Sequence, residues 1–222
     1  MKTKYIIIII IIILLLLLII SSYYILFLRK LYSSNSVIKG NNHINVNKLM
    51  IIAHPDDELI FGGREILEEK GWKIVCITNG SSKSGNIFSF CSAEKRREEF
   101  ISVMNKMDCA YEIWDYEDNY FNANWNEKIL VRQLSNLLNE KKYRKIVTHN
   151  LNGEYGHIQH KKISEIIHYL KPKKLYIFDY KDSESNPYIE KINDISLLYS
   201  SQKNVIRKHY NYVIHQSLKK IL

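Results

Sequence analysis

Leu49-Met-Ile-Ile-Ala53, followed directly by His54-Pro-Asp-Asp-Glu58, is the stretch that decides the fold. The apolar run predicts a buried strand, because short uninterrupted apolar segments suit strands that are covered on both faces. The strand ends by delivering an imidazole and three carboxylates into one turn. Open α/β sheets bind their ligands at the carboxyl ends of the strands. The sequence therefore predicts an α/β enzyme with a metal site directly after this strand.

A second polar cluster follows another strand-like run, Tyr143–Thr148. The segment after it supplies His157 and His160 at a spacing that suits one face of a helix start. A lone His-Pro-Asp-Asp stretch is equally compatible with a solvated turn, since Pro and Asp both favour turns. Two such clusters at strand ends are hard to explain by solubility, so we favour a metal site.

Strand-like runs alternate with helical stretches from residue 47 onward. The alternation predicts a Rossmann-like α/β fold, a mostly parallel sheet with helices on both faces. We expect a helix over about 92–107 and a helical tail from Asn186 that packs against the sheet. The first strand does not lead into a Gly-x-Gly-x-x-Gly turn, so a nucleotide cofactor is disfavoured. The strand-like runs lie near 48–53, 73–78, 110–115, 145–149 and 174–179.

Ala53-His-Pro-Asp-Asp-Glu58 and Gly156-His-Ile-Gln-His160 together resemble the LmbE/PIG-L family of zinc-dependent de-N-acetylases, which act on N-acetylglucosamine-containing substrates. The resemblance covers most of the chain from about Asn47 to Tyr180 and implies an LmbE-like fold. Zinc is the implied cofactor, although Fe(II) or another divalent cation also suits a site of nitrogen and oxygen ligands. The implied roles are metal ligation by His54, Asp57 and His160, general base catalysis by Asp56, and stabilisation of the tetrahedral intermediate by His157.

These implied roles agree with the chemistry of the residues. Three protein ligands leave a fourth metal position for water, and a carboxylate bound to metal lacks the basicity and freedom of a general base. Asp56 is therefore the expected proton acceptor, Asp57 the ligand, and a protonated His157 an expected partner of the oxyanion. The reaction class is amide hydrolysis.

Three further residues are expected to have supporting or substrate-binding roles: Glu58, Arg96 and Gln159. Glu58 is expected to brace the motif by hydrogen bonds, although the helix dipole alone would favour an acid there. Arg96 belongs to a family-like Arg-x-x-Glu pattern with Glu99, which implies a substrate contact; a surface helix carrying charge pairs is the open alternative. Gln159 stands where many bacterial members have Asp. A neutral amide orients His157 without raising its pKa, and it mildly favours a glycolipid substrate because the eukaryotic branch is similar.

The N-terminal stretch Tyr5–Leu28 is apolar apart from serines and tyrosines. As a helix it is long enough to cross a hydrocarbon core of roughly 30 Å. We expect an uncleaved membrane anchor over 1–28, a polar linker over 29–46 and one catalytic domain over 47–222. A secretory signal is the alternative, but the apolar stretch is too long and lacks a clear cleavage site. The basic residues that follow the span favour a catalytic domain on the cytoplasmic side.

The net charge of +9 is compatible with two kinds of partner. Nucleic acid is disfavoured, because the lysines are dispersed and no aromatic-basic stripe is present. Anionic lipid head groups fit better beside a membrane anchor, although A/T-rich codon usage would produce the same lysine excess. The three cysteines form no disulfide framework.

We therefore expect a membrane-anchored, zinc-dependent de-N-acetylase that acts on an N-acetylglucosaminyl glycolipid. N-acetylglucosaminyl-phosphatidylinositol leads as substrate, which implies GPI-anchor biosynthesis at the endoplasmic reticulum membrane. Another N-acetylated sugar conjugate stays open as the substrate. So does a different class of protein, a catalytically silent relative that binds sugar or lipid.

Overall fold

The computed structural model describes residues 2–33, 37–42, 44–80, 87–182 and 185–222, and the chain divides into two units, Met1–Ser36 and Val37–Leu222. The first unit contains a single described helix, α1 (Lys2–Ser33). Within it, Lys4–Ile25 is 22 residues long, has a mean hydropathy of 3.4 and is entirely unburied. This length and composition suit a membrane-crossing helix, and a signal sequence would share them.

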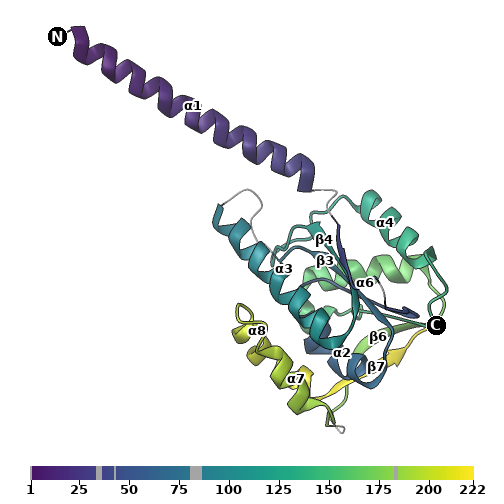
Figure 1. Ribbon diagram of the computed structural model, residues 1–222. Helices are drawn as coiled ribbons and strands as arrows, with labels where there is room; N and C mark the ends of the chain where they lie inside the picture. The colour runs from purple at the N-terminus through teal and green to yellow at the C-terminus, as the bar shows by residue number, and fades with distance from the viewer. Residues whose placement is uncertain (1, 34–36, 43, 81–86, 183–184) are drawn as a thin grey trace. The chain divides into compact units, whose positions relative to one another are not determined.

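The second unit is built on a seven-stranded sheet with the strand order β1-β4-β3-β2-β5-β6-β7. Figure 1 shows this sheet with helices packed around it. The inner strands are parallel, and an antiparallel strand closes each edge. The strands are β1 (Ile38–Gly40), β2 (Lys48–Ile52), β3 (Trp72–Thr78), β4 (Ala110–Tyr116), β5 (Lys145–Thr148), β6 (Leu175–Tyr180) and β7 (Gln216–Lys220). The helices are α2 (Asp57–Glu68), α3 (Ile87–Met107), α4 (Glu127–Asn139), α5 (Gly153–Gly156), α6 (Ile158–Leu170), α7 (Ile189–Ser196), α8 (Lys203–Lys208) and α9 (Tyr210–Ile214).

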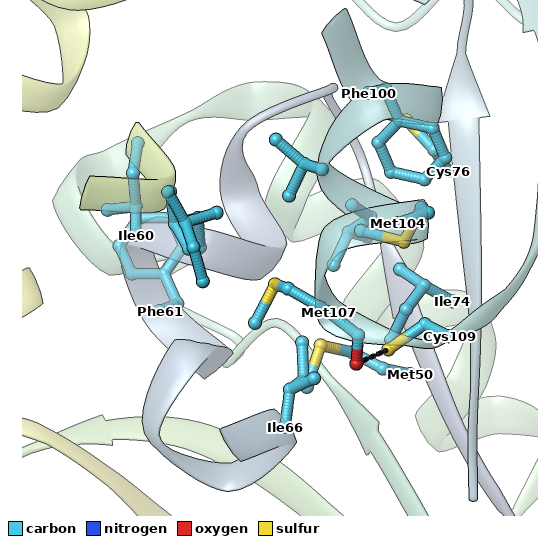
Figure 2. Close-up of a cluster of buried hydrophobic side chains, with 14 of the residues drawn as sticks. Met50, Ile60, Phe61, Ile66, Ile74, Cys76, Phe100, Met104, Met107 and Cys109 are labelled. Carbon is cyan, nitrogen blue, oxygen red and sulfur yellow. Dashed lines mark hydrogen bonds between the residues drawn. The ribbon is translucent and has the colours of Figure 1, made fainter. Parts of the chain in front are cut away.

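Both faces of this sheet are covered, as the continuous apolar run of β2 predicted. Side chains alternate across a strand, so Met50 and Ile52 enter one hydrophobic cluster while Leu49 and Ile51 enter the other. Figure 2 shows the first cluster, in which side chains of α2 and α3 pack with Met50. The second cluster is completed by α4 and α6. The predicted mostly parallel sheet with helices on both faces is confirmed.

The two antiparallel edge strands were not predicted. Ile38–Gly40 lies within the segment expected to be a linker, and it pairs with β4 over only three residues. Gln216–Lys220 lies in the tail that was expected to be helical, and it pairs with β6. Its sequence, Gln-Ser-Leu-Lys-Lys, carries no strong hydrophobic signal, because Gln216 is buried through hydrogen bonds to the carbonyls of Leu59 and Ile60 rather than through apolar packing. The rest of the tail is helical, as expected.

The C-terminal tail is tied to the first motif by a buried hydrogen bond. Tyr199 and Glu58 are both completely buried, and the Tyr199 hydroxyl donates to Glu58 Oε1 at 2.5 Å. The other carboxyl oxygen accepts from the Asp56 amide at 3.2 Å. Burial raises the pKa of Glu58 to about 8 against the opposing effect of the Tyr199 hydrogen bond. These contacts support the expected bracing role of Glu58.

Tyr199→Phe is expected to lower the free energy of unfolding by about 1–3 kcal/mol, because it leaves a buried carboxyl oxygen without its donor. Urea unfolding of the detergent-solubilised chain measures the change. Tyr169→Phe, at a side chain that is 74% exposed, is the matched control and should change stability by less than about 0.5 kcal/mol. Equal stability of the two variants would show that the Tyr199 hydrogen bond contributes nothing.

Candidate active site

The candidate site lies where the strand order reverses, at the carboxyl ends of β2 and β5. β2 is the first parallel strand in the chain, and its neighbours are β3 on one side and β5 on the other. Chains that leave two such strands in opposite directions open a crevice between them, which is the usual ligand site of an open α/β sheet. The segment after β2 carries His54, Asp56 and Asp57, and the segment after β5 carries His157 and His160. The fold thus brings both sequence clusters together.

The turn after β2 holds its side chains in a constrained conformation. The His54 amide donates to Asp57 Oδ2 at 2.7 Å, so the carboxylate is fastened to its own turn. Asp56 has a φ of 139°, a value that L residues rarely adopt. Its carbonyl accepts from the amides of Leu59 and Ile60, so the first turn of α2 holds this strained residue in place. Backbone strain of this kind is concentrated at functional sites.

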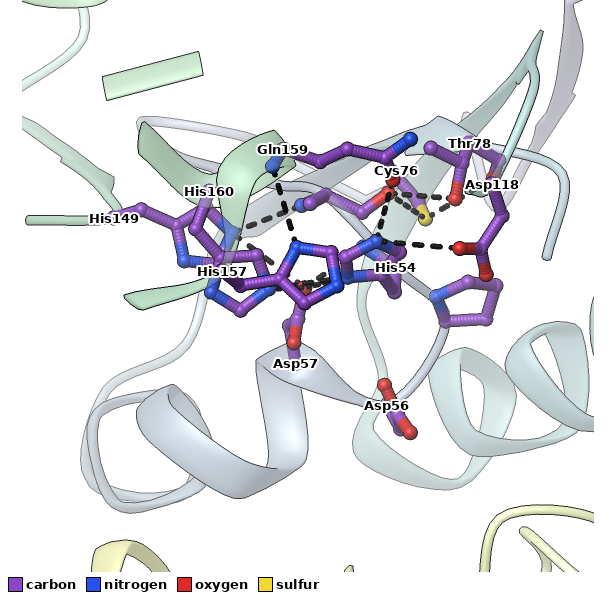
Figure 3. Close-up of polar contacts among 12 residues, drawn as sticks. His54, Asp56, Asp57, Cys76, Thr78, Asp118, His149, His157, Gln159 and His160 are labelled. Carbon is purple, nitrogen blue, oxygen red and sulfur yellow. Dashed lines mark hydrogen bonds and ion pairs between the residues drawn. The ribbon is translucent and has the colours of Figure 1, made fainter. Parts of the chain in front are cut away.

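The three residues implied as metal ligands present three atoms to one point. His54 Nδ1 lies 3.1 Å from His160 Nε2 and 3.2 Å from Asp57 Oδ2, and the last two atoms are 3.4 Å apart. Ligands at about 2.0–2.1 Å from a tetrahedral metal lie roughly 3.3 Å from each other. All three side chains are buried, and Figure 3 shows them converging. The measured triangle has the size of one face of a tetrahedral site.

The tautomers of the two imidazoles support this assignment. Gln159 Nε2 donates to the carbonyls of Glu117 and Asn122, both at 3.0 Å, which fixes the amide so that Oε1 faces His54 Nε2 at 2.7 Å. His54 Nε2 therefore carries the proton, and its Nδ1 presents a lone pair to the site. Glu154 Oε2 lies 2.7 Å from His160 Nδ1 and fixes that ring in the same way. Two nitrogen lone pairs and a carboxylate thus converge, a donor set that fits a divalent cation.

Two further histidines lie close to these ligands but are already engaged. His149 Nε2 accepts from the Ala53 amide at 2.9 Å, while its Nδ1 is 2.9 Å from Glu154 Oε2. His157 Nδ1 accepts from the Gln159 amide at 3.3 Å, and burial and the nearby imidazoles of His54 and His160 lower the pKa of His157 to about 3. This geometry favours a neutral His157 that offers Nε2–H, whereas the sequence led us to expect a protonated ring.

Asp56 and Asp57 are adjacent but have different surroundings. Burial alone would raise the pKa of Asp57, but the His160 and His54 imidazoles outweigh it and hold the pKa well below the usual range. Burial raises the pKa of Asp56 to about 7 against the attraction of Arg96. Asp56 stands apart from the imidazole cluster in Figure 3, and its Oδ2 has no hydrogen-bond partner among the described residues. The two carboxylates are therefore suited to the different roles of base and ligand.

Arg96 lies inside the site and ties its loops together. Its guanidinium donates to Asp118 Oδ2 at 2.6 Å, to the Gly80 carbonyl at 3.1 Å and to the Pro55 carbonyl at 3.2 Å. It also lies 3.9 Å from Asp56 Oδ1. Only 11% of this side chain is exposed, so the alternative of a surface helix with charge pairs is wrong for Arg96. A direct contact between Arg96 and substrate stays a prediction.

Sequence reasoning also misjudged the partner of Gln159 and overlooked three residues. The Gln159 side chain holds His54, and only its backbone amide contacts His157. Each of the residues overlooked follows a strand, which is the signal that would have found them. His149 and Asp118 lie within two residues of the ends of β5 and β4, and Glu154 follows shortly after His149. The overlooked residues are Asp118, His149 and Glu154.

The backbone of Glu154 is strained in order to reach both histidines. Its φ is 56° and its ψ is −77°, and it lies between two glycines, Gly153 and Gly156, that also have positive φ. Burial alone would raise the pKa of Glu154, but His149 and His160 outweigh it and lower the pKa to about 2. A carboxylate that orients a metal-binding imidazole is the usual second partner of such a ligand.

Comparison with known proteins agrees with this geometry. Residues 49–171 match the PIG-L family, described as GlcNAc-PI de-N-acetylase. The chain is 56% identical over 197 residues to the uncharacterized protein L374 of Acanthamoeba polyphaga mimivirus, covering 86% of this chain and 88% of that protein. It is 26% identical to N-acetylglucosaminyl-phosphatidylinositol de-N-acetylase of Saccharomyces cerevisiae, covering 85% of this chain and 66% of that protein.

A solved structure shares the fold. The N,N'-diacetylchitobiose deacetylase of Pyrococcus horikoshii superposes with a TM-score of 0.58 at 15% identity, covering 80% of this chain and 84% of that one. The family match spans both motifs, from the strand before His54 to the end of the helix that carries His160. The chain therefore belongs to the LmbE/PIG-L family of de-N-acetylases, hydrolases of N-acetylated sugars, and has a buried His/Asp group that suits a metal ion.

Proposed function

We propose that this protein removes the acetyl group from an N-acetylglucosaminyl glycolipid, with N-acetylglucosaminyl-phosphatidylinositol as the leading substrate. The observation that carries the chemistry is the triangle of His54 Nδ1, Asp57 Oδ2 and His160 Nε2, together with a carboxylate on the same turn, Asp56, that lies outside this triangle. The name of the yeast relative supports the choice of glycolipid. Zinc is the proposed metal, and Fe(II) is the alternative.

His54, Asp57 and His160 would hold the metal, which supplies polarisation of the amide carbonyl and a water of lowered pKa. Asp56 takes the proton from the attacking water, because its carboxylate lies outside the ligand set. His157 donates its Nε2–H to the developing oxyanion as a neutral imidazole, which stabilises charge as it forms. Asp56 then returns a proton to the leaving amine, and Arg96 keeps the Asp56 carboxylate in position.

The N-terminal helix supports the proposal that this reaction takes place at a membrane. Lys4–Ile25 is apolar enough to span a bilayer, and a glycolipid substrate resides in one. We propose an uncleaved anchor over residues 1–28, joined through residues 29–46, which include the short edge strand β1, to the catalytic domain over 47–222. The endoplasmic reticulum membrane, with the domain facing the cytoplasm, is the proposed location.

The full chain, reconstituted in vesicles and loaded with zinc, is assayed for amine release from N-acetylglucosaminyl-phosphatidylinositol and from a water-soluble N-acetylglucosamine conjugate. We expect release from the glycolipid that a chelator abolishes and added zinc restores. Release from the soluble sugar alone would support the deacetylase reaction but would show that the glycolipid is not the substrate. If zinc binds and neither substrate is hydrolysed, the protein is a silent sugar- or lipid-binding relative.

A further inference from the structure

Two aromatic side chains are presented to solvent at the edge of the site. Phe121 is 81% exposed, more than any other large hydrophobic side chain in the described part of the chain, and its neighbour Tyr120 is 60% exposed. Their rings are in edge contact, 5.3 Å between centroids. Exposed aromatic side chains that gather at one place indicate a contact surface.

The loop that carries these rings is fastened on both sides. Gln159 donates to the carbonyls of Glu117 and Asn122, which bracket the aromatic pair. The Phe121 amide donates to Asn119 Oδ1 at 3.0 Å, and the Trp125 indole donates to the Glu117 carbonyl at 2.9 Å. Phe121 is therefore held outward by the same glutamine that orients His54.

Further apolar side chains continue this surface around His157. The Tyr120 ring lies 5.3 Å from the His157 ring, and the Tyr155 ring lies 5.8 Å from it. Ile158 directly follows His157 and is 44% exposed. We call this set the apolar rim: Tyr120, Phe121, Tyr155 and Ile158.

A lipid surface is the partner that fits the apolar rim. The same chain carries an unburied apolar helix of membrane-spanning length, and its net charge of +9 favours contact with anionic lipid head groups. Aromatic rings are enriched at the level of the lipid head groups, where one side is apolar and the other is wet. A lipid-linked sugar also needs the mouth of the site to meet the membrane, because its acyl chains otherwise have to leave the bilayer.

We propose that the apolar rim, led by Phe121 on its fastened loop, inserts into the head-group region of a lipid bilayer and delivers the sugar of a lipid-linked substrate to the site. The proposal rests on the proposed function and extends it from the identity of the substrate to the way it enters. Insertion of the apolar rim into lipid does not require catalysis, so it can be measured without hydrolysis of a substrate.

The first test places a fluorescent probe in the rim. Phe121→Trp is introduced into the full chain and reconstituted in phosphatidylcholine vesicles that contain phosphatidylinositol, with bromine on the acyl chains. We expect the added emission to shift to the blue and to be quenched by bromine. Tyr169→Trp is the matched control, because Tyr169 is 74% exposed and lies roughly 16 Å along α6 from Ile158. Its added emission should stay unquenched, and the native Trp72, Trp114 and Trp125 signal is subtracted using the unmodified chain.

The second test separates insertion from chemistry. Phe121→Ser is expected to lower kcat/KM for the bilayer-embedded glycolipid by about 10- to 100-fold, since an apolar side chain no longer enters the lipid. Hydrolysis of a water-soluble N-acetylglucosamine conjugate should be unchanged. The indole introduced by Phe121→Trp could be quenched in a chain that does not hydrolyse the glycolipid. That result would support insertion of the apolar rim and overturn the proposed substrate.

In the reverse result, the glycolipid is hydrolysed while the introduced indole stays unquenched. This would overturn insertion of the apolar rim and leave the proposed substrate standing. The emission of this indole is also measured in detergent without lipid. If it changes with protein concentration, the partner that covers the apolar rim is a second copy of the chain. That outcome also overturns the proposal.

Discussion

Asp56→Asn is expected to lower the rate of deacetylation by about 10²- to 10⁴-fold and to leave metal affinity unchanged. The amide that replaces the carboxylate keeps its size but no longer accepts a proton from water. Metal affinity should persist, because Asp56 contributes none of the three ligand atoms that form the triangle. The measurement pairs the amine-release assay with metal content after dialysis.

Asp57→Asn is the control for this prediction. The two residues are adjacent and both are buried, but Asp57 Oδ2 faces the imidazoles while Asp56 Oδ2 has no partner among the described residues. We expect Asp57→Asn to lose bound metal and activity together. If Asp56→Asn instead lost its metal, or kept activity within about tenfold of the unmodified protein, Asp56 would not be the general base.

The core of the fold could be predicted because its signals are local. Leu49–Ile52 is buried on both faces, so its apolar run is continuous, and the strand ends two residues before His54. His157 and His160 flank a helix start, and their spacing already shows this in the sequence. The convergence of His54, Asp57 and His160 then follows from one topological fact, that β2 and β5 are neighbours in a parallel sheet.

Interactions between distant segments could not be predicted in the same way. Arg96 lies in a run of charged residues that suggests a surface helix, but its guanidinium is drawn inward by Asp118 and by two loop carbonyls. Glu99 of the same run accepts hydrogen bonds from the Ser200 hydroxyl and the Ser201 amide in the C-terminal tail. The position of β7 depends on pairing with β6 rather than on its own polar sequence.

The Gln159 side chain contacts His54, whereas the sequence indicated His157 as its partner. Both ends of its amide group are engaged by the protein: Oε1 faces His54 Nε2, and Nε2 donates to two carbonyls of the loop after β4. Gln159→Leu removes the acceptor that fixes the His54 tautomer. We expect metal affinity to fall by about 10- to 100-fold, the usual cost of losing the partner of a metal-binding histidine.

Gln159→Glu separates the two functions of this amide. The carboxylate still accepts from His54 but offers no donor to the carbonyls of Glu117 and Asn122. Competition with a chelator should therefore show near-normal metal affinity for Gln159→Glu and weak affinity for Gln159→Leu, while both variants loosen the loop that carries Tyr120 and Phe121. Equal loss of affinity in both would mean that Gln159 acts through the loop alone. Unequal loss would locate its effect on the metal at His54, one hydrogen bond away.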